Sequence, residues 1–264
     1  MKYLVVGNPI SHSLSPELHN YWFKINKIKA TYEKKEILNS DLKNLILDMR
    51  EKKIDGINIT VPFKNKIIPY LDELTTESKN TQSVNTVYLQ KDKIIGHNTD
   101  IDGFRRSLEK IKFNFEGKNI LILGAGGVVP SMISALNTMS VSKIFVSNRT
   151  KEKAEKLKNI FKNIDVVKWG YIPNFDVIIN ATSVGLKKDD KLNLDFTKVG
   201  KNKLFYDVIY NPSETNFLKS GKKLGNIAEN GKMMFVYQAL YAFKIWHSLE
   251  PKINDEVLKI VSND

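Results

Sequence analysis

The stretch ILILGAGGVVP, residues 120–130, decides the fold of this chain. Its first four residues are a short apolar run typical of a buried parallel strand, a glycine turn follows, and a helical pattern begins near Val129. Pro130 is compatible with the first turn of a helix. A strand that passes through a tight glycine turn into a helix begins a βαβ unit, so we expect a lobe with a doubly wound sheet.

The same turn carries a glycine fingerprint of the kind that binds dinucleotides. Gly124 would allow the tight turn, and Gly126 would let the backbone approach a pyrophosphate held at the helix N-terminus. The third fingerprint position is Val129, where a small residue is usual. A strand-to-helix turn without a ligand is the alternative interpretation.

The cofactor's ribose would lie near the end of the next expected strand, residues 143–147. That strand leads into Asn148-Arg149-Thr150, where an NAD site would place an acidic residue, yet no Asp or Glu occurs from residue 124 to residue 151. A guanidinium can bind a 2′-phosphate through charge-assisted hydrogen bonds, and Lys153 would add a second positive charge. The sequence therefore predicts NADP, with an exposed loop cation as the alternative for Arg149.

Strand and helix patterns outside this segment predict two α/β lobes. Expected strands in the first lobe are residues 2–6, 31–37 and 56–60 with a hairpin of 85–90 and 93–97, and expected helices are 15–27 and 41–53. A helix over residues 100–110 would lead to the second lobe, whose further strands are 176–179, 204–208 and 226–228, before an aromatic-rich core helix over 232–248. We expect residues 1–100, joined by helices in 236–264, to form one lobe and residues 101–235 the dinucleotide-binding lobe.

The first lobe contains a strand that ends in polar residues, GINITVPFK at positions 56–64. Asn58 and Thr60 are two residues apart and project from one face of an extended segment. Pro62 ends the strand and leaves Lys64 at its carboxyl end, where open α/β sheets bind ligands. A polar face turned to solvent is the alternative.

Composition excludes several classes of protein. The chain is 42% hydrophobic and contains no apolar run near the ~18 residues of a spanning helix, so we expect a soluble, cytoplasmic protein without membrane association. It has no cysteine and four scattered histidines, which excludes disulfides and predicts no metal site. The net charge of +12 is spread along the chain, and without a recognisable nucleic-acid-binding motif we expect no nucleic-acid partner.

Short motifs follow one another from Val6 to about Trp246. They are GNPISHSLSPELHN at 7–20, NITVPFK at 58–64, VNT at 84–86, GHNTD at 96–100, GAGG at 124–127, NRT at 148–150, NATS at 180–183, YNP at 210–212 and Gln238. In this order they resemble the shikimate dehydrogenase family. The resemblance implies an NADP-dependent oxidoreductase acting on a CH–OH group: it would reversibly reduce 3-dehydroshikimate to shikimate with NADPH, in the biosynthesis of chorismate and aromatic amino acids.

The resemblance also implies residue roles. Lys64 and Asp100 would be the catalytic pair, because an ammonium beside the ketone oxygen stabilises its developing charge and supplies a proton, while the carboxylate orients the ammonium. Ser13 and Ser15 would hold the substrate carboxylate. The full substrate-binding set is Ser13, Ser15, Asn58, Thr60, Lys64, Asn85, Asp100, Tyr210 and Gln238. The full cofactor-binding set is Gly124, Ala125, Gly126, Gly127, Asn148, Arg149, Thr150, Lys153, Ala181, Thr182, Ser183, Val208 and Gly231.

Two departures from the family pattern concern the cofactor. Met233 replaces a small residue near the nicotinamide, and Val129-Pro130 replace a small residue and an arginine. The alternatives are a quinate/shikimate dehydrogenase with relaxed cofactor use and a non-catalytic NADP-binding sensor on the same fold. The sequence leaves a homodimer open, and His12 and His19 are expected to be structural.

Overall fold

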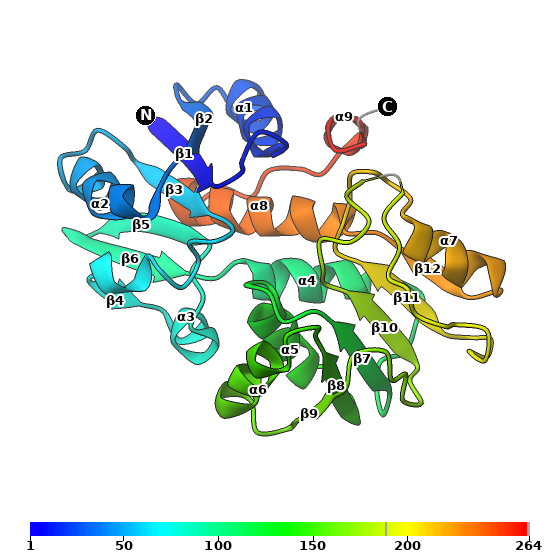
Figure 1. The fold of residues 1–264 in the computed structure, drawn as a ribbon. Helices are drawn as coiled ribbons and strands as arrows, with labels where there is room; N and C mark the ends of the chain where they lie inside the picture. The colour runs from blue at the N-terminus through cyan, green and yellow to red at the C-terminus, as the bar shows by residue number, and fades with distance from the viewer. Residues whose placement is uncertain (188, 263–264) are drawn as a thin grey trace. The chain divides into compact units, whose positions relative to one another are not determined.

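The computed structural model describes residues 1–187 and 189–262, and the chain divides into two compact units (Figure 1). The first unit contains residues 1–103 and the segment from Val236 onward, and the second contains residues 104–235. The division falls inside two helices, α4 (Asp100–Glu109) and α8 (Lys232–His247). Each unit has its own sheet with helices, which confirms the expected α/β class.

The first unit is built on a six-stranded mixed sheet in the order β2-β1-β3-β5-β6-β4. β1 pairs in parallel with β2 and β3, β5 is antiparallel to β3 and β6, and the short β4 is parallel to β6. The strands are β1 (Lys2–Gly7), β2 (Thr31–Glu36), β3 (Gly56–Ile59), β4 (Glu73–Leu74), β5 (Thr86–Gln90) and β6 (Lys93–His97). The expected hairpin is confirmed: Lys91 and Asp92 both have positive φ, as a two-residue turn between right-twisted strands requires.

Helices cover this sheet on two faces. α2 buries its predicted apolar face, which includes Leu45 and Met49, in a core with β1 and β3. α1 and the last turns of α8 contribute an aromatic cluster in which Phe23 and Phe243 are buried, so the aromatic stripe of the last long helix is core as expected. The helices are α1 (Ser15–Ile25), α2 (Leu42–Arg50), α3 (Thr76–Thr81) and α9 (Asp255–Ile260), with single 3-10 turns at η1 (Asn39–Asp41) and η2 (Ile68–Tyr70).

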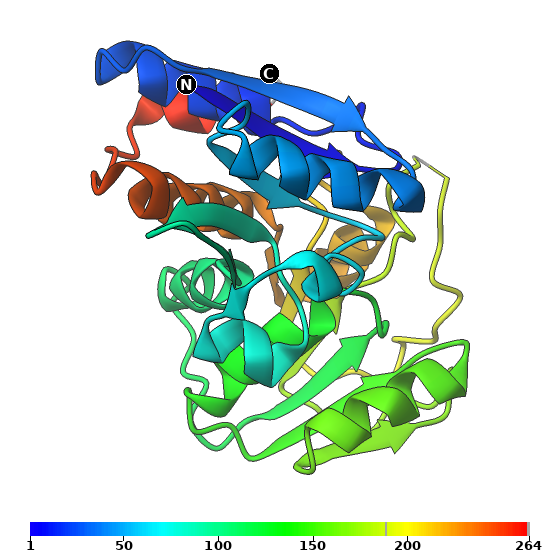
Figure 2. The same cartoon turned by 90° about the vertical axis from the view of Figure 1, so that its left-hand side faces the viewer.

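The second unit has an entirely parallel sheet in the order β12-β11-β10-β7-β8-β9. The strands are β7 (Asn119–Leu123), β8 (Lys143–Ser147), β9 (Ile164–Val167), β10 (Val177–Asn180), β11 (Leu204–Asp207) and β12 (Ile227–Glu229), and the helices are α5 (Val129–Asn137), α6 (Lys151–Ile160) and α7 (Asn216–Lys223). Figure 2 shows α6 alongside β9 at one edge of this sheet. Chain order reverses between β7 and β10, so the loops after these strands lie at the switch point where doubly wound sheets bind ligands.

The sequence did not predict two short edge strands, β4 and β9. β4 has only two residues, and β9 carries a charged residue among three apolar ones, so neither forms a clear alternating run. The first helix ends earlier than expected, at Ile25, because Lys27 adopts a left-handed conformation with φ of 54°. Within the ranges that the structure describes, no helix combines the length and apolar character needed to cross a membrane.

Candidate active site

Two serines lie together where β1 leads into α1. Ser15 is the first residue of α1 and is buried, whereas Ser13 is partly exposed in the preceding loop. The hydroxyl of Ser13 lies 3.2 Å from that of Ser15 and accepts the backbone N–H of Ser15 at 3.3 Å. The two hydroxyls thus form one polar site at the carboxyl end of β1.

A buried tyrosine holds the side chain of Asn58 on β3. The Tyr32 hydroxyl donates to Asn58 Oδ1 at 2.6 Å. Asn58 Nδ2 donates to the carbonyl oxygen of Asn85 at 3.0 Å and to Thr86 Oγ1 at 3.1 Å. Because every polar atom of the Asn58 amide has a partner, its orientation is fixed in advance of any ligand.

Lys64 and Asp100 form a buried ion pair. Lys64 Nζ lies 2.5 Å from Asp100 Oδ2, and the two side chains are only 11% and 8% exposed. The other carboxylate oxygen, Oδ1, accepts Asn85 Nδ2 at 3.0 Å. Among the residues that the structure describes, Nζ has no second partner, and since an ammonium has three protons, two remain for a substrate oxygen.

The remaining members of the expected substrate set are more dispersed. Thr60 follows β3 and is partly exposed, and Gln238 lies on α8, where its backbone packs against Gly103 of α4. Tyr210 belongs to the second unit, where its ring stacks on Phe235 with centroids 4.6 Å apart. The hydrogen bonds of the first unit join Asn58, Asn85, Asp100 and Lys64 in one network, and a separate bond pairs Ser13 with Ser15.

Behind Tyr32 lies the buried His19. Its ring stacks on the Tyr32 ring at 4.3 Å with an interplanar angle of 3°, and neither ring nitrogen has a hydrogen-bond partner among the described residues. Burial, with a smaller contribution from His247, lowers the pKa of His19 to about 3, so the ring is neutral at physiological pH. These buried, aromatic surroundings suit the structural role expected for His19, whereas His12 is exposed.

In the second unit the glycine turn has the shape that the fingerprint requires. Gly124 has φ of 112°, and a Cβ there would lie 2.8 Å from the carbonyl oxygen of Ala181, so only glycine fits. At Gly126 the nearest atom to such a Cβ is 4.0 Å away, which leaves an open approach to the backbone at the start of α5. These residues suit a pyrophosphate, and the NADP assignment is compatible with them.

Arg149 lies in the turn between β8 and α6. Asn148 Nδ2 donates to the carbonyl oxygen of Thr150 at 2.7 Å, and this bond shapes the turn and leaves the Arg149 side chain exposed. No acidic side chain in the described part of the chain pairs with Arg149 or with the Lys153 ammonium. Both cations are thus available to a phosphate.

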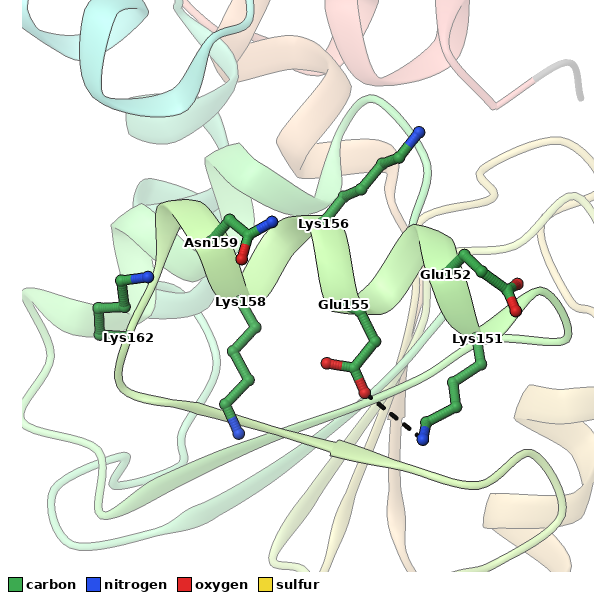
Figure 3. Close-up of a pocket in the computed structure, with 7 residues that line it drawn as sticks. All are labelled: Lys151, Glu152, Glu155, Lys156, Lys158, Asn159 and Lys162. Atoms are coloured by element: carbon green, nitrogen blue, oxygen red, sulfur yellow. Dashed lines mark ion pairs between the residues drawn. The ribbon is translucent and has the colours of Figure 1, made fainter.

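The helix that follows carries an open surface hollow bordered only by polar side chains. Figure 3 shows the lining residues, Lys151, Glu152, Glu155, Lys156, Lys158, Asn159 and Lys162. Lys151 and Glu155 form an ion pair at 3.6 Å, one turn apart. Ligand pockets are mostly apolar, and alternating lysines and glutamates on one helix are typical of a solvated face, so we place no ligand here.

The loops after β10 and β11 complete the switch-point edge of the second sheet. Ala181, Thr182 and Ser183 follow β10, and Val208 follows β11. A Cβ on Gly231 would lie 2.1 Å from the carbonyl oxygen of Val208, so this glycine is needed for close contact between the two segments. All these residues were expected to bind cofactor, and they share one edge of the sheet.

In comparisons with known proteins, each of the two units of the chain matches one family model. A family model described as the shikimate dehydrogenase substrate binding domain matches residues 5–87, and one described as shikimate / quinate 5-dehydrogenase matches residues 107–207. A protein of Pelagibacter ubique named shikimate dehydrogenase (NADP(+)) is 56% identical over 259 residues, which cover 98% of each chain. The chain belongs to the shikimate dehydrogenase family.

Solved structures of this family have the same fold. Shikimate dehydrogenase from Aquifex aeolicus is 38% identical with a TM-score of 0.91, covering 100% of this chain and 98% of that one. The Thermus thermophilus enzyme, solved in complex with NADP(H) and shikimate, is 27% identical with a TM-score of 0.89 and the same coverage. The fold and the family resemblance inferred from the motifs are therefore confirmed.

Several residues that support the site are not among those predicted from the sequence. Tyr32 is buried within β2, and its position as a lone aromatic residue among the charges of TYEKKE is the signal that indicates an inward-facing side chain. Two threonines hold the Asn85 amide: Thr86 Oγ1 donates to Asn85 Oδ1 at 3.0 Å, and Thr99 Oγ1 accepts Asn85 Nδ2 at 2.9 Å. Asp207, which ends β11, had no assigned role and is completely buried.

Proposed function

We propose that this chain is an NADP-dependent shikimate dehydrogenase that reversibly reduces 3-dehydroshikimate to shikimate in the route to chorismate and aromatic amino acids. The observation that carries the proposal is the buried Lys64–Asp100 pair, whose lysine lies in the region matched by a substrate-binding family model. A ketone that accepts hydride gains negative charge on oxygen, and Lys64 offers that oxygen two unpaired N–H groups. The pair thus supplies what carbonyl reduction needs at the oxygen.

We propose that Lys64 Nζ donates the proton that the substrate oxygen takes up, and removes it in the reverse direction. Asp100 holds the ammonium in place, and Asn85 holds Asp100 from the other carboxylate oxygen. Ser13 and Ser15 bind the substrate carboxylate, while Asn58, Thr60, Asn85, Asp100 and Gln238 bind ring hydroxyls and Tyr210 makes a further contact. Polar groups held by their own network recognise a hydroxylated ring at little cost in reorganisation.

In this proposal the second unit holds NADP, which supplies the hydride when bound. Gly124, Ala125, Gly126 and Gly127 line the pyrophosphate, and Asn148, Arg149, Thr150 and Lys153 surround the 2′-phosphate. Ala181, Thr182, Ser183, Val208 and Gly231 line the nicotinamide half. Residues 1–100 with 236–264 are then the substrate-binding lobe, and residues 101–235 the NADP-binding lobe. The absence of an acidic partner for Arg149 among the described residues supports the choice of NADP over NAD.

The test is the initial rate of absorbance change at 340 nm with shikimate or quinate as substrate and NADP+ or NAD+ as cofactor. Shikimate with NADP+ should give the highest kcat/KM of the four combinations. Comparable rates with quinate and NAD+ would instead identify a quinate/shikimate dehydrogenase with relaxed cofactor use. Binding of NADP+ without turnover of either substrate would identify a non-catalytic sensor.

We also propose the cytoplasm as its compartment, because the reaction uses metabolites of the cell interior, and cell fractionation tests this assignment. A homodimer is tested by light scattering on the purified chain. Neither proposal affects the chemistry above.

A further inference from the structure

Asp207 is a buried carboxylate that the proposed reaction does not use. It ends β11, has no exposed surface, and accepts three hydrogen bonds: from Asn180 Nδ2 at 3.1 Å, from the Ile209 N–H at 3.0 Å and from Thr215 Oγ1 at 2.6 Å. Within the part of the chain that the structure describes, no cation pairs with it. Burial raises the pKa of Asp207 to about 6. A buried carboxylate with three neutral donors and no cation is costly, so its presence calls for a role.

The first contact of Asp207 controls the loop after β10. Asn180 Nδ2 donates both to Asp207 and to the carbonyl oxygen of Val184 at 3.0 Å, which leaves Asn180 Oδ1 to accept the N–H and the hydroxyl of Thr182 at 3.1 and 2.7 Å. A carboxylate can only accept, so it dictates which end of the Asn180 amide faces it. The loop from Ala181 to Val184 is thus wrapped around an amide that Asp207 orients.

The second and third contacts control the segment after β11. The carbonyl oxygen of Ile209 accepts the Gly231 N–H at 3.2 Å, so the turn that Asp207 fixes at the Ile209 N–H also holds Gly231 against Val208. Thr215 caps α7 by accepting the Leu218 N–H at 3.3 Å, and its hydroxyl proton goes to Asp207. One carboxylate therefore ties together both loops at the switch-point edge of the sheet.

We propose that Asp207 is a positioning residue for the cofactor: it holds the loops after β10 and β11 as one preformed surface, and thereby sets the affinity for the nicotinamide half of NADP without touching it. This assignment rests on the proposed function. Preformed loops bind more tightly because less ordering is needed on binding. Removing the carboxylate charge should loosen both loops together.

The test is calorimetric titration of NADP+, which needs no turnover, on the wild type and on Asp207→Asn. The substitution keeps the shape but replaces one acceptor oxygen with an amide N–H₂ donor. Depending on the amide orientation, this donor faces either Asn180 and Ile209, or Thr215. NADP+ binding should weaken by about tenfold, the usual size of a lost hydrogen bond to a charged group, while the KM for shikimate at saturating NADP+ changes less than threefold. Asn180→Ala should weaken NADP+ similarly, and the double variant should be little worse than the weaker single variant.

The matched control is Asp176→Asn. Asp176 accepts the Asn119 N–H at 3.0 Å and pairs with Lys203 at 3.4 Å, so it also ties strands of this sheet together, but at their amino ends. It should lower thermal stability and leave NADP+ affinity within twofold of the wild type. Equal losses of affinity in the two aspartate variants would show a merely structural effect and overturn the assignment.

Two further outcomes are decisive. If Asp207→Asn is folded by circular dichroism and binds NADP+ like the wild type, the assignment is wrong although the proposed function stands. If Asp207→Asn does not fold, Asn180→Ala, which keeps two of the three donors to Asp207, decides in its place: unchanged NADP+ affinity would refute the assignment. A wild type that binds no NADP+ would refute the proposed function itself.

Discussion

Removing the charge from Asp100 tests whether the buried pair is one catalytic unit. In Asp100→Asn the oxygen that accepts the Asn85 amide can stay. An amide N–H₂ then replaces Oδ2, the oxygen that lies 2.5 Å from Lys64 Nζ in the wild type. Two donors repel, so the ammonium must move from its position. Because the side chains are 11% and 8% exposed, water screens the pair little, and loss of one partner should cost about 3–5 kcal/mol of stability.

Substitution of Lys64, the proposed proton donor, should lower turnover more than substitution of Asp100. Lys64→Ala should lower kcat by roughly a hundredfold to ten-thousandfold, which corresponds to about 3–5 kcal/mol in the barrier. Asp100→Asn should lower kcat through the displaced ammonium. The double variant should be little slower than the slower single variant, and it should be more stable than Asp100→Asn because no unpaired buried charge remains.

Steady-state kinetics with shikimate and NADP+, together with urea unfolding, measure both quantities on the same preparations. Lys66→Ala is the matched control, since Lys66 lies two residues away, is exposed and has no carboxylate partner among the described residues. It should keep kcat within twofold. Near-wild-type kcat in a folded Lys64→Ala variant would refute the mechanism, and fully additive losses in the double variant would show that the two residues act separately.

Three other predictions concern substrate, cofactor and pH. Ser13→Ala with Ser15→Ala should raise the KM for shikimate by about tenfold with kcat nearly unchanged, because the hydroxyls bind a group remote from the reacting carbon; steady-state kinetics check this, and an unchanged KM would exclude the role. Arg149→Ala should weaken NADP+ by about tenfold to a hundredfold and leave NAD+ nearly unaffected in binding titrations, whereas equal losses would make Arg149 structural. His19 has its pKa lowered to about 3 in the folded chain, against about 6.5 when unfolded, so the unfolded state binds the proton first and stability falls as pH drops below 6.5. His19→Phe should reduce the loss of unfolding free energy between pH 7 and pH 5 by about 2 kcal/mol, measured by urea denaturation at both pH values, and equal losses in variant and wild type would contradict the assigned burial.

Local signals in the sequence were enough to predict the frame of both units. Gly124 lies between a strand and a helix, where the turn requires a positive φ that glycine adopts readily. The glycine fingerprint could therefore be recognised from the sequence. Lys64 was placed at the carboxyl end of β3 because proline ends a strand. Both inferences needed only neighbouring residues.

Residues that act across long sequence separations could not be predicted in this way. Tyr32 and Asn58 are 26 residues apart and meet only because β1 lies between β2 and β3 in the sheet. Asp207 belongs to a completely buried strand, where a run of apolar neighbours gives no indication of donors 27 residues before it and 8 residues after it. Strand order, which a single sequence does not state, decides such contacts.

The two units share one device for orienting amides at strand ends. In the first, Asp100 accepts Asn85 Nδ2 at 3.0 Å, and the Asn85 Oδ1 then accepts the Thr99 N–H at 2.8 Å. In the second, Asp207 accepts Asn180 Nδ2 at 3.1 Å, and Asn180 Oδ1 accepts the Thr182 N–H at 3.1 Å.

An amide can be reversed with little change in shape, whereas a carboxylate offers acceptors only, so each aspartate removes one of two otherwise similar arrangements. The difference between the sites lies in the second carboxylate oxygen. That of Asp100 faces the Lys64 ammonium, which is the proton donor in the proposed mechanism, whereas that of Asp207 faces the neutral Thr215 hydroxyl and can only hold the loops in place. Asp→Asn should therefore change kcat at the first site and cofactor affinity at the second.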